Sequence, residues 1–77
     1  MSDPLIQLFS EELDVDISEL SDESSPDTVE KWDSLAAVRL VLAIESQFNV
    51  RLSSIAIMKM RTIGLAREVL RSKGVAV

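Results

Sequence analysis

Ser34 is the residue best placed to take part in chemistry. It lies in the run EKWDSL, residues 30–35, where a segment rich in acids and hydroxyls ends and an apolar segment without Gly or Pro begins. The apolar positions 35, 38, 41, 42, 44 and 48 follow helical spacing, which predicts a helix over residues 34–48. Asp33 and Ser34 both favour a helix N-cap, so we expect Ser34 at the helix start with its hydroxyl near water. A serine there can carry a phosphate group, because the first turn offers free N–H donors and the positive end of the helix dipole.

The side chains available argue against an enzyme. The chain has no His, Cys or Tyr, so a general base near neutral pH would have to be a carboxylate or a lysine shifted by burial. Ser34 would need an adjacent base to act as a nucleophile, and Asp33 is a weak one. The lack of Cys excludes a disulfide framework and a thiolate metal site. No metal site is expected, because the acids that begin at Asp14 have EF-hand spacing but Glu19 stands where that loop needs Gly.

The run Asp33-Ser34-Leu35, at the head of a helix that ends in ESQFNV, resembles the Asp-Ser-Leu signature of acyl carrier proteins. The resemblance covers nearly the whole chain. It implies that Ser34 bears 4′-phosphopantetheine, whose thiol carries acyl groups as thioesters, and that Asp33 helps to position magnesium while the cofactor is transferred from coenzyme A. Helix capping is the alternative role of Asp33. The implied partners are a phosphopantetheinyl transferase and acyl-loading, acyl-transfer or condensing enzymes.

The chain departs from the carriers of primary fatty-acid synthesis in ways that bear on its partners. Those carriers usually have Gly two residues before the Asp, where this chain has Lys31, and they present several acids along the second helix, which basic partner enzymes recognise. We therefore expect a carrier for a dedicated lipid, polyketide or other specialised pathway. The residues expected to contact partners are Trp32, Leu35, Ala36, Arg39 and Lys59, with a peg into the core as the alternative for Trp32. The inward face of the helix is expected to hold Val38, Val41, Leu42 and Phe48.

The rest of the sequence predicts three further helices, which gives an all-α, four-helix bundle of the acyl-carrier type in one domain, residues 1–77. Asp3-Pro4 predicts an N-cap and first turn for a helix over 3–13. A loop over 14–33 follows, held to the core by Val15, Ile17, Leu20 and Val29. After a left-handed cap at Asn49, short and final helices are expected over 54–60 and 62–73. The resemblance implies that the short helix, with Met58 and Met60 as core residues or as a soft lining, borders a pocket for the acyl chain.

Charge is unevenly distributed along the chain. The net charge of −5 divides into −10 for residues 1–33 and +5 for residues 34–77. The two halves either solvate the surface and attract each other across it, or form a polarised docking surface. The basic half has no dense cationic cluster and few aromatic residues, which argues against nucleic-acid binding. No segment is long and apolar enough to span a membrane and no signal-peptide pattern is present, so we expect a cytoplasmic monomer.

Two alternatives to an acyl carrier remain open. A peptidyl or aminoacyl carrier would use the same arm on the same serine. A helical protein-interaction adaptor, with Ser34 as a helix cap only, would also explain the small size and the charge asymmetry.

Overall fold

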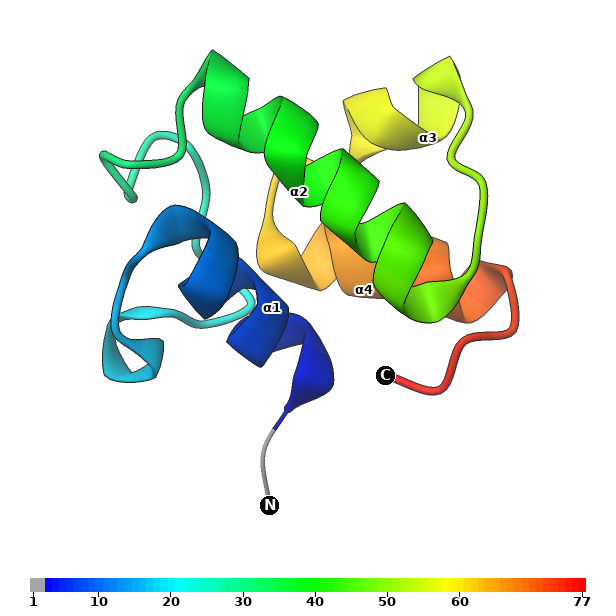
Figure 1. Ribbon diagram of the computed structural model, residues 1–77, viewed down its shortest axis with the longest axis horizontal. Coiled ribbons are helices and arrows are strands. Elements are labelled where there is room, and N and C mark those ends of the chain that lie inside the picture. Colours follow the sequence, from blue (N-terminus) through cyan, green and yellow to red (C-terminus); the bar gives the residue numbers. More distant parts are fainter. Residues whose placement is uncertain (1–2) are drawn as a thin grey trace.

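The computed structural model describes residues 3–77, which form four α-helices and one turn of 3-10 helix and contain no strand. The helices are α1 (Pro4–Leu13), η1 (Ile17–Glu19), α2 (Ser34–Phe48), α3 (Ser54–Lys59) and α4 (Ile63–Ser72). In Figure 1, α2 crosses the molecule with α1 on one side and α3 on the other, and α4 passes behind it. The predicted all-α bundle with a short third helix and a long connection before the second is confirmed.

Each helix begins at a side-chain cap, which explains why its start is visible in the sequence. The Asp3 carboxylate accepts hydrogen bonds from the N–H groups at the start of α1, and Pro4 follows it. Asp33, Ser53 and Thr62 cap α2, α3 and α4 in the same way. Helix starts thus differ from the predicted ones by at most one residue. The predicted left-handed cap after α2 is confirmed, since Asn49 has a φ of 54°.

The core lies where α1, α2 and α4 meet. α1 packs against α2 and α4, and α3 packs against α4. The largest fully buried side chains are Phe9, Leu5, Ile44, Ile63 and Leu70. Phe9 also meets Trp32 edge to face, with ring centroids 5.2 Å apart. This aromatic pair ties α1 to the segment that leads into α2.

The predicted inward face of α2 is wrong for Val38 and Leu42, whereas Val41 and Phe48 pack partly buried against the core as predicted. Val38 and Leu42 are 58% and 60% exposed, whereas Ala36, Leu40 and Ile44 are buried. Both sets have helical spacing, because α2 is apolar on more than one face. The difference is a rotation of the helix, and it leaves an apolar surface in contact with solvent. Ile17, which was expected to hold the long loop to the core, is also exposed.

Arg67 fastens the long connection between α1 and α2 to the helices. It is 8% exposed, and its Nη2 lies 2.7 Å from Asp3 Oδ2 and 2.8 Å from Asp22 Oδ1. The backbone adds two bonds next to this cluster, from Ile63 N–H to the carbonyl of Ser24 and from Gly64 N–H to that of Asp22. A Cβ at position 64 would lie 3.0 Å from that Asp22 carbonyl oxygen, so glycine permits this close approach.

Candidate functional site

Ser34 is the first residue of α2, and its side chain is exposed. The cap of α2 is Asp33, whose Oδ1 accepts the N–H of Ala36 at 2.8 Å. Within residues 3–77, no hydrogen bond occupies the Ser34 hydroxyl. Capping is thus performed by the neighbouring residue, and the hydroxyl stays accessible to a modifying enzyme.

The first turn of α2 suits an anionic group on Ser34. The N–H of Ala37 makes the first backbone bond of the helix, to the carbonyl of Asp33, so the N–H groups of Ser34 and Leu35 precede the intrahelical ladder. These donors lie at the positive end of the helix dipole. A phosphodiester attached to Ser34 Oγ would meet a favourable field there, and water can reach it. The residues present therefore fit a phosphate-linked group.

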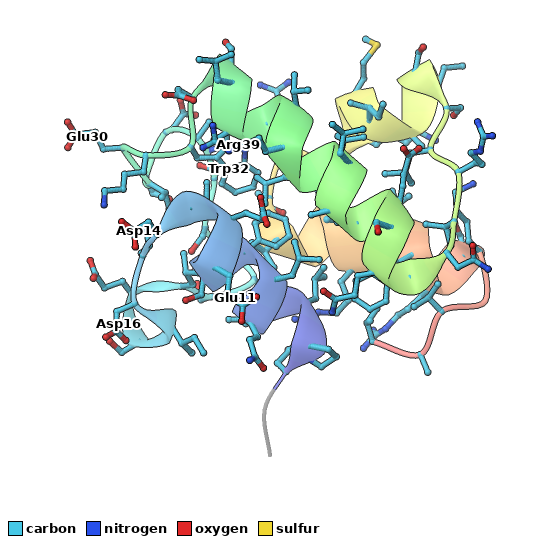
Figure 2. The ribbon with its side chains drawn as sticks, viewed as in Figure 1. Glu11, Asp14, Asp16, Glu30, Trp32 and Arg39 are labelled. Atoms are coloured by element: carbon cyan, nitrogen blue, oxygen red, sulfur yellow. The ribbon has the colours of Figure 1, made fainter. Side chains whose placement is uncertain are left out.

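Trp32 and Lys31 hold the chain in position immediately before the site. Trp32 is 6% exposed and lies between α1 and the start of α2 (Figure 2). The backbone N–H of Trp32 donates to the carbonyl of Val29, and Lys31 Nζ donates to the carbonyl of Asp14. Ser34 consequently projects from an anchored junction.

Two of the five residues predicted to contact partners are buried and do not lie on the surface. Trp32 is the core peg that was its alternative role, and Ala36 is fully buried because it lies on the face of α2 that packs on α1. A buried side chain offers no area to a docking enzyme. Leu35, Arg39 and Lys59 are exposed, so their contact with partners remains a prediction.

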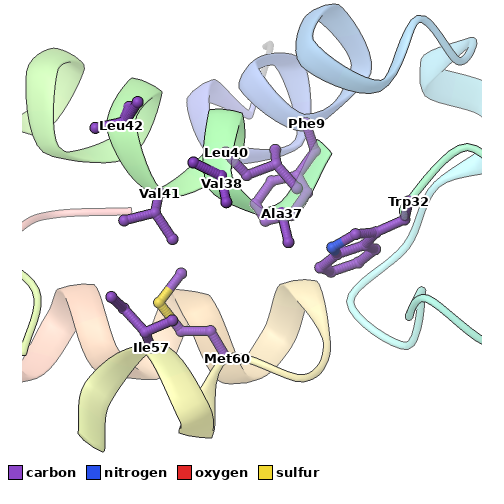
Figure 3. A pocket seen from close by; sticks show the side chains of 9 residues that line it. All are labelled: Phe9, Trp32, Ala37, Val38, Leu40, Val41, Leu42, Ile57 and Met60. Atoms are coloured by element: carbon purple, nitrogen blue, oxygen red, sulfur yellow. The ribbon is translucent and has the colours of Figure 1, made fainter. Parts of the chain in front are cut away.

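An apolar cavity of about 260 Å³ lies between α2 and α3, close to the site (Figure 3). Its lining consists of hydrophobic side chains from four segments, namely Phe9, Trp32, Ala37, Val38, Leu40, Val41, Leu42, Ile57 and Met60. Val38 and Leu42 are more than half exposed, so the cavity opens to the surface. Met60 belongs to this lining, whereas Met58 is 74% exposed and belongs neither to the core nor to the cavity.

Arg67 is the structurally important residue that the sequence interpretation missed. It had been counted only among the cations of the basic half, although its position carried a signal. Positions 63, 66, 67 and 70 form a helical stripe whose other members are apolar and buried. An arginine inside such a stripe predicts a buried cation with carboxylate partners.

These ion pairs shift the acidity of the groups involved. Burial by itself would raise the pKa of Asp3, but hydrogen bonds from Arg67 and from the N–H groups of Ile6 and Leu5 outweigh it and lower that pKa below its ordinary value. Hydrogen bonds from Arg67 to Asp22 and to Asp3 raise the pKa of Arg67 above its usual range. Asp3 and Arg67 are therefore both ionised at neutral pH.

A small helical bundle with an exposed serine at the head of its second helix and an anchored acidic segment before it defines a carrier type of protein. The model of the phosphopantetheine attachment site family matches residues 3–66, which run from the cap of α1 into α4. The chain belongs to this family, and its cofactor is covalently attached 4′-phosphopantetheine. None of the curated proteins compared with the chain matches it significantly.

Family membership also sets the kind of protein with which the chain works. Carrier domains of this family are not catalytic themselves, and they interact with the enzymes that modify them and handle their acyl groups. Within residues 3–77, no helix has the length and apolar character needed to cross a membrane.

Proposed function

We propose that the chain is an acyl carrier protein that bears 4′-phosphopantetheine on Ser34. The observation that carries this assignment is the exposed, unbonded hydroxyl at the first position of α2, next to a cap residue that makes a capping serine unnecessary. When bound, the cofactor supplies a thiol on which acyl groups are held as thioesters. Ser34 Oγ would attack the coenzyme A phosphate that bears the pantetheine, a base of the transferase would take the hydroxyl proton, and the pyrophosphate bond would break to release adenosine 3′,5′-bisphosphate. One oxygen of Asp33 holds the helix cap, and the other would be available to help position the magnesium ion of the transferase.

Intact mass spectrometry tests the attachment directly. The purified chain is incubated with coenzyme A, magnesium and a promiscuous phosphopantetheinyl transferase. We expect a gain of one phosphopantetheinyl group that Ser34→Ala abolishes and Ser46→Ala leaves unchanged, since Ser46 is an exposed serine on the same helix. Absence of any gain with several transferases would favour the adaptor. A gain that persists in Ser34→Ala would place the cofactor on another residue.

The cavity favours an acyl cargo over an aminoacyl or peptidyl one. Its lining is apolar, and it is smaller than the sites that hold drug-sized ligands, so a short or medium aliphatic chain fits it. Each methylene group that enters contributes about 0.8 kcal/mol. A charged amine or a peptide group would instead be buried without a hydrogen-bond partner, at a cost of about 1 to 3 kcal/mol or more. We therefore propose that the acyl chain shelters between α2 and α3.

Trp32 reports whether this sheltering takes place, because it lines the cavity and is the only tryptophan in the chain. Loading the modified protein with a saturated medium-length acyl group should change the Trp32 emission and reduce its quenching by acrylamide, relative to the unloaded form. An aminoacyl group should leave both unchanged. Ala37→Phe, which fills the cavity, should abolish the response while Ser34 is still modified. Equal responses to the acyl and aminoacyl groups would support the peptidyl alternative.

The pathway is proposed from the charges of α2 and its surroundings. Residues 34–62 carry four cations, Arg39, Arg51, Lys59 and Arg61, against the single carboxylate of Glu45. This pattern supports a carrier that serves a specialised lipid or polyketide pathway. The test uses the ketosynthase of primary fatty-acid synthesis. If this enzyme elongates acyl groups on this chain as well as it does on the carrier of primary fatty-acid synthesis, the assignment is contradicted.

A further inference from the structure

The face of α2 and α3 beside Ser34 is apolar although it lies in water. Leu35, Val38 and Leu42 have helical i, i+3 and i+7 spacing and are 73%, 58% and 60% exposed. On α3, Ile55 and Met58 are three residues apart and are exposed to a similar degree. The two helices flank the mouth of the cavity (Figure 3). We refer to these five residues, Leu35, Val38, Leu42, Ile55 and Met58, as the apolar face.

A cation borders the apolar face on each of its two helices. Arg39 lies on the side of α2 that is turned toward α1 (Figure 2), and Lys59 follows Met58 on α3. The only acid in α2 is Glu45, and its Oε2 already accepts the N–H of Leu52 at 2.8 Å. The nearest other acid is Asp33, the exposed cap of α2, which lies at the Ser34 end of the face. An approaching surface therefore meets hydrophobic side chains in the centre and a cation on each side.

We infer that the apolar face docks partner enzymes whose carrier-binding surface is apolar at its centre and acidic at its rim. The inference rests on the proposed function, because an enzyme that acts on a group attached to Ser34 must approach this end of α2. Apolar contact in the centre provides affinity, while the paired charges at the rim set partner choice and the rate of encounter. Enzymes with a basic rim would face Arg39 and Lys59 with like charge and bind less well.

Two other occupants of the apolar face are less compatible with the charges. A second copy of the chain related by a two-fold axis would bring Arg39 and Lys59 of both copies to one interface, where like charges repel. An anionic membrane would attract these two cations, but it would repel the ten excess negative charges of residues 1–33. A protein surface, unlike a membrane plane, can place its acids opposite the two cations and none opposite Asp33.

Complementary charge reversal tests the inference. The probe is the malonyl transferase of primary fatty-acid synthesis, used in its native form with a basic carrier-binding surface and in a form with those Lys and Arg residues changed to Glu. Binding of the unmodified, ¹⁵N-labelled chain is followed by amide shifts at low salt. We expect the charge-reversed enzyme to bind wild type about tenfold more tightly than the native enzyme does. Arg39→Glu/Lys59→Glu should reverse this order.

The controls separate docking from folding and from cofactor attachment. Met58→Gln should weaken binding to both enzymes, whereas Lys73→Glu, at the far end of α4 (Figure 1), should change neither affinity. Thermal unfolding checks that every variant folds. Because the unmodified chain is used, absence of phosphopantetheine on Ser34 would contradict the proposed function and leave the binding result valid.

Three outcomes would overturn the inference. The first is an unchanged order of affinities in Arg39→Glu/Lys59→Glu. The second is a wild-type dimer in sedimentation velocity that Met58→Gln dissociates, which would assign the apolar face to a second copy. The third is co-sedimentation of wild type, but not of Arg39→Glu/Lys59→Glu, with vesicles of phosphatidylcholine and phosphatidylglycerol.

Discussion

At the scale of single residues, Asp33 and Ser34 divide two tasks that either residue type can perform. Both are common helix caps, and the sequence left open which of them would fill that position. The structure gives the cap to Asp33, so the serine hydroxyl beside it stays unbonded within the described residues. A carboxylate has a further oxygen that can meet a metal ion during modification. The same side chain can therefore stabilise the helix and assist the transferase.

Substitutions of Asp33 separate these two tasks. Asp33→Ala removes the cap and should lower the free energy of unfolding by about 1 kcal/mol, whereas Asp33→Asn retains a capping oxygen and should change it by less than about 0.5 kcal/mol. If Asp33 also helps to position magnesium, Asp33→Asn should slow modification of Ser34 by a transferase while the fold stays intact. Urea unfolding at pH 7 and the rate of mass gain measure the two effects. Wild-type modification rates in Asp33→Asn would limit the residue to capping.

At the scale of the helices, the sequence predicts which segments are helical and where they begin better than it predicts which face of a helix is turned to the core. Helix starts depend on local chemistry, namely Asp3 with Pro4, then Asp33, Ser53 and Thr62, and all of these can be recognised without knowledge of the fold. The rotation of α2 depends on which of two apolar stripes meets α1. That choice is made by packing partners from distant segments, so the periodicity of α2 alone could not supply it.

Paired truncations on α2 test its rotation. Leu40 is buried in the core, so Leu40→Ala should lower the free energy of unfolding by about 2 to 5 kcal/mol. Leu42 loses little burial when truncated, and Leu42→Ala should stay within about 0.5 kcal/mol of wild type. Urea denaturation of the two variants provides the comparison. Equal destabilisation by both would show that the apolar face is covered in solution.

At the scale of the whole molecule, some of the opposite charges of the two halves of the sequence pair with each other in the folded protein. Arg67 from the basic half binds Asp3 and Asp22 from the acidic half, and the three side chains join α4, the start of α1 and the long connection. The sequence predicted attraction between the halves but not this arrangement, because Asp3 and Asp22 lie 64 and 45 residues before Arg67 in the chain. The same cluster holds the connection that leads to Ser34.

The pH dependence of stability should reveal the Arg67 cluster. The pKa of Asp3 is lowered in the folded state, so its contribution is present above the unfolded value, near pH 4, and is lost as the pH falls through the folded pKa. As the pH falls below about 4, wild type should therefore lose stability more steeply than Asp3→Asn, which retains a capping oxygen but cannot titrate. Hydrogen bonds from Ser18 lower the pKa of Asp16 as well. Asp16 is present in wild type and in Asp3→Asn, so it does not account for a difference between them.

Urea midpoints measured across this range give the difference between the two curves. Arg67→Met should make stability depend less on pH in the same way, because it removes the cation that lowers the pKa of Asp3. Parallel curves for wild type and Asp3→Asn would mean that the cluster does not hold the long connection in solution. The position of Ser34 would then depend on the Trp32 and Phe9 pair, on Lys31 and on the backbone bonds of Ile63 and Gly64 to the connection.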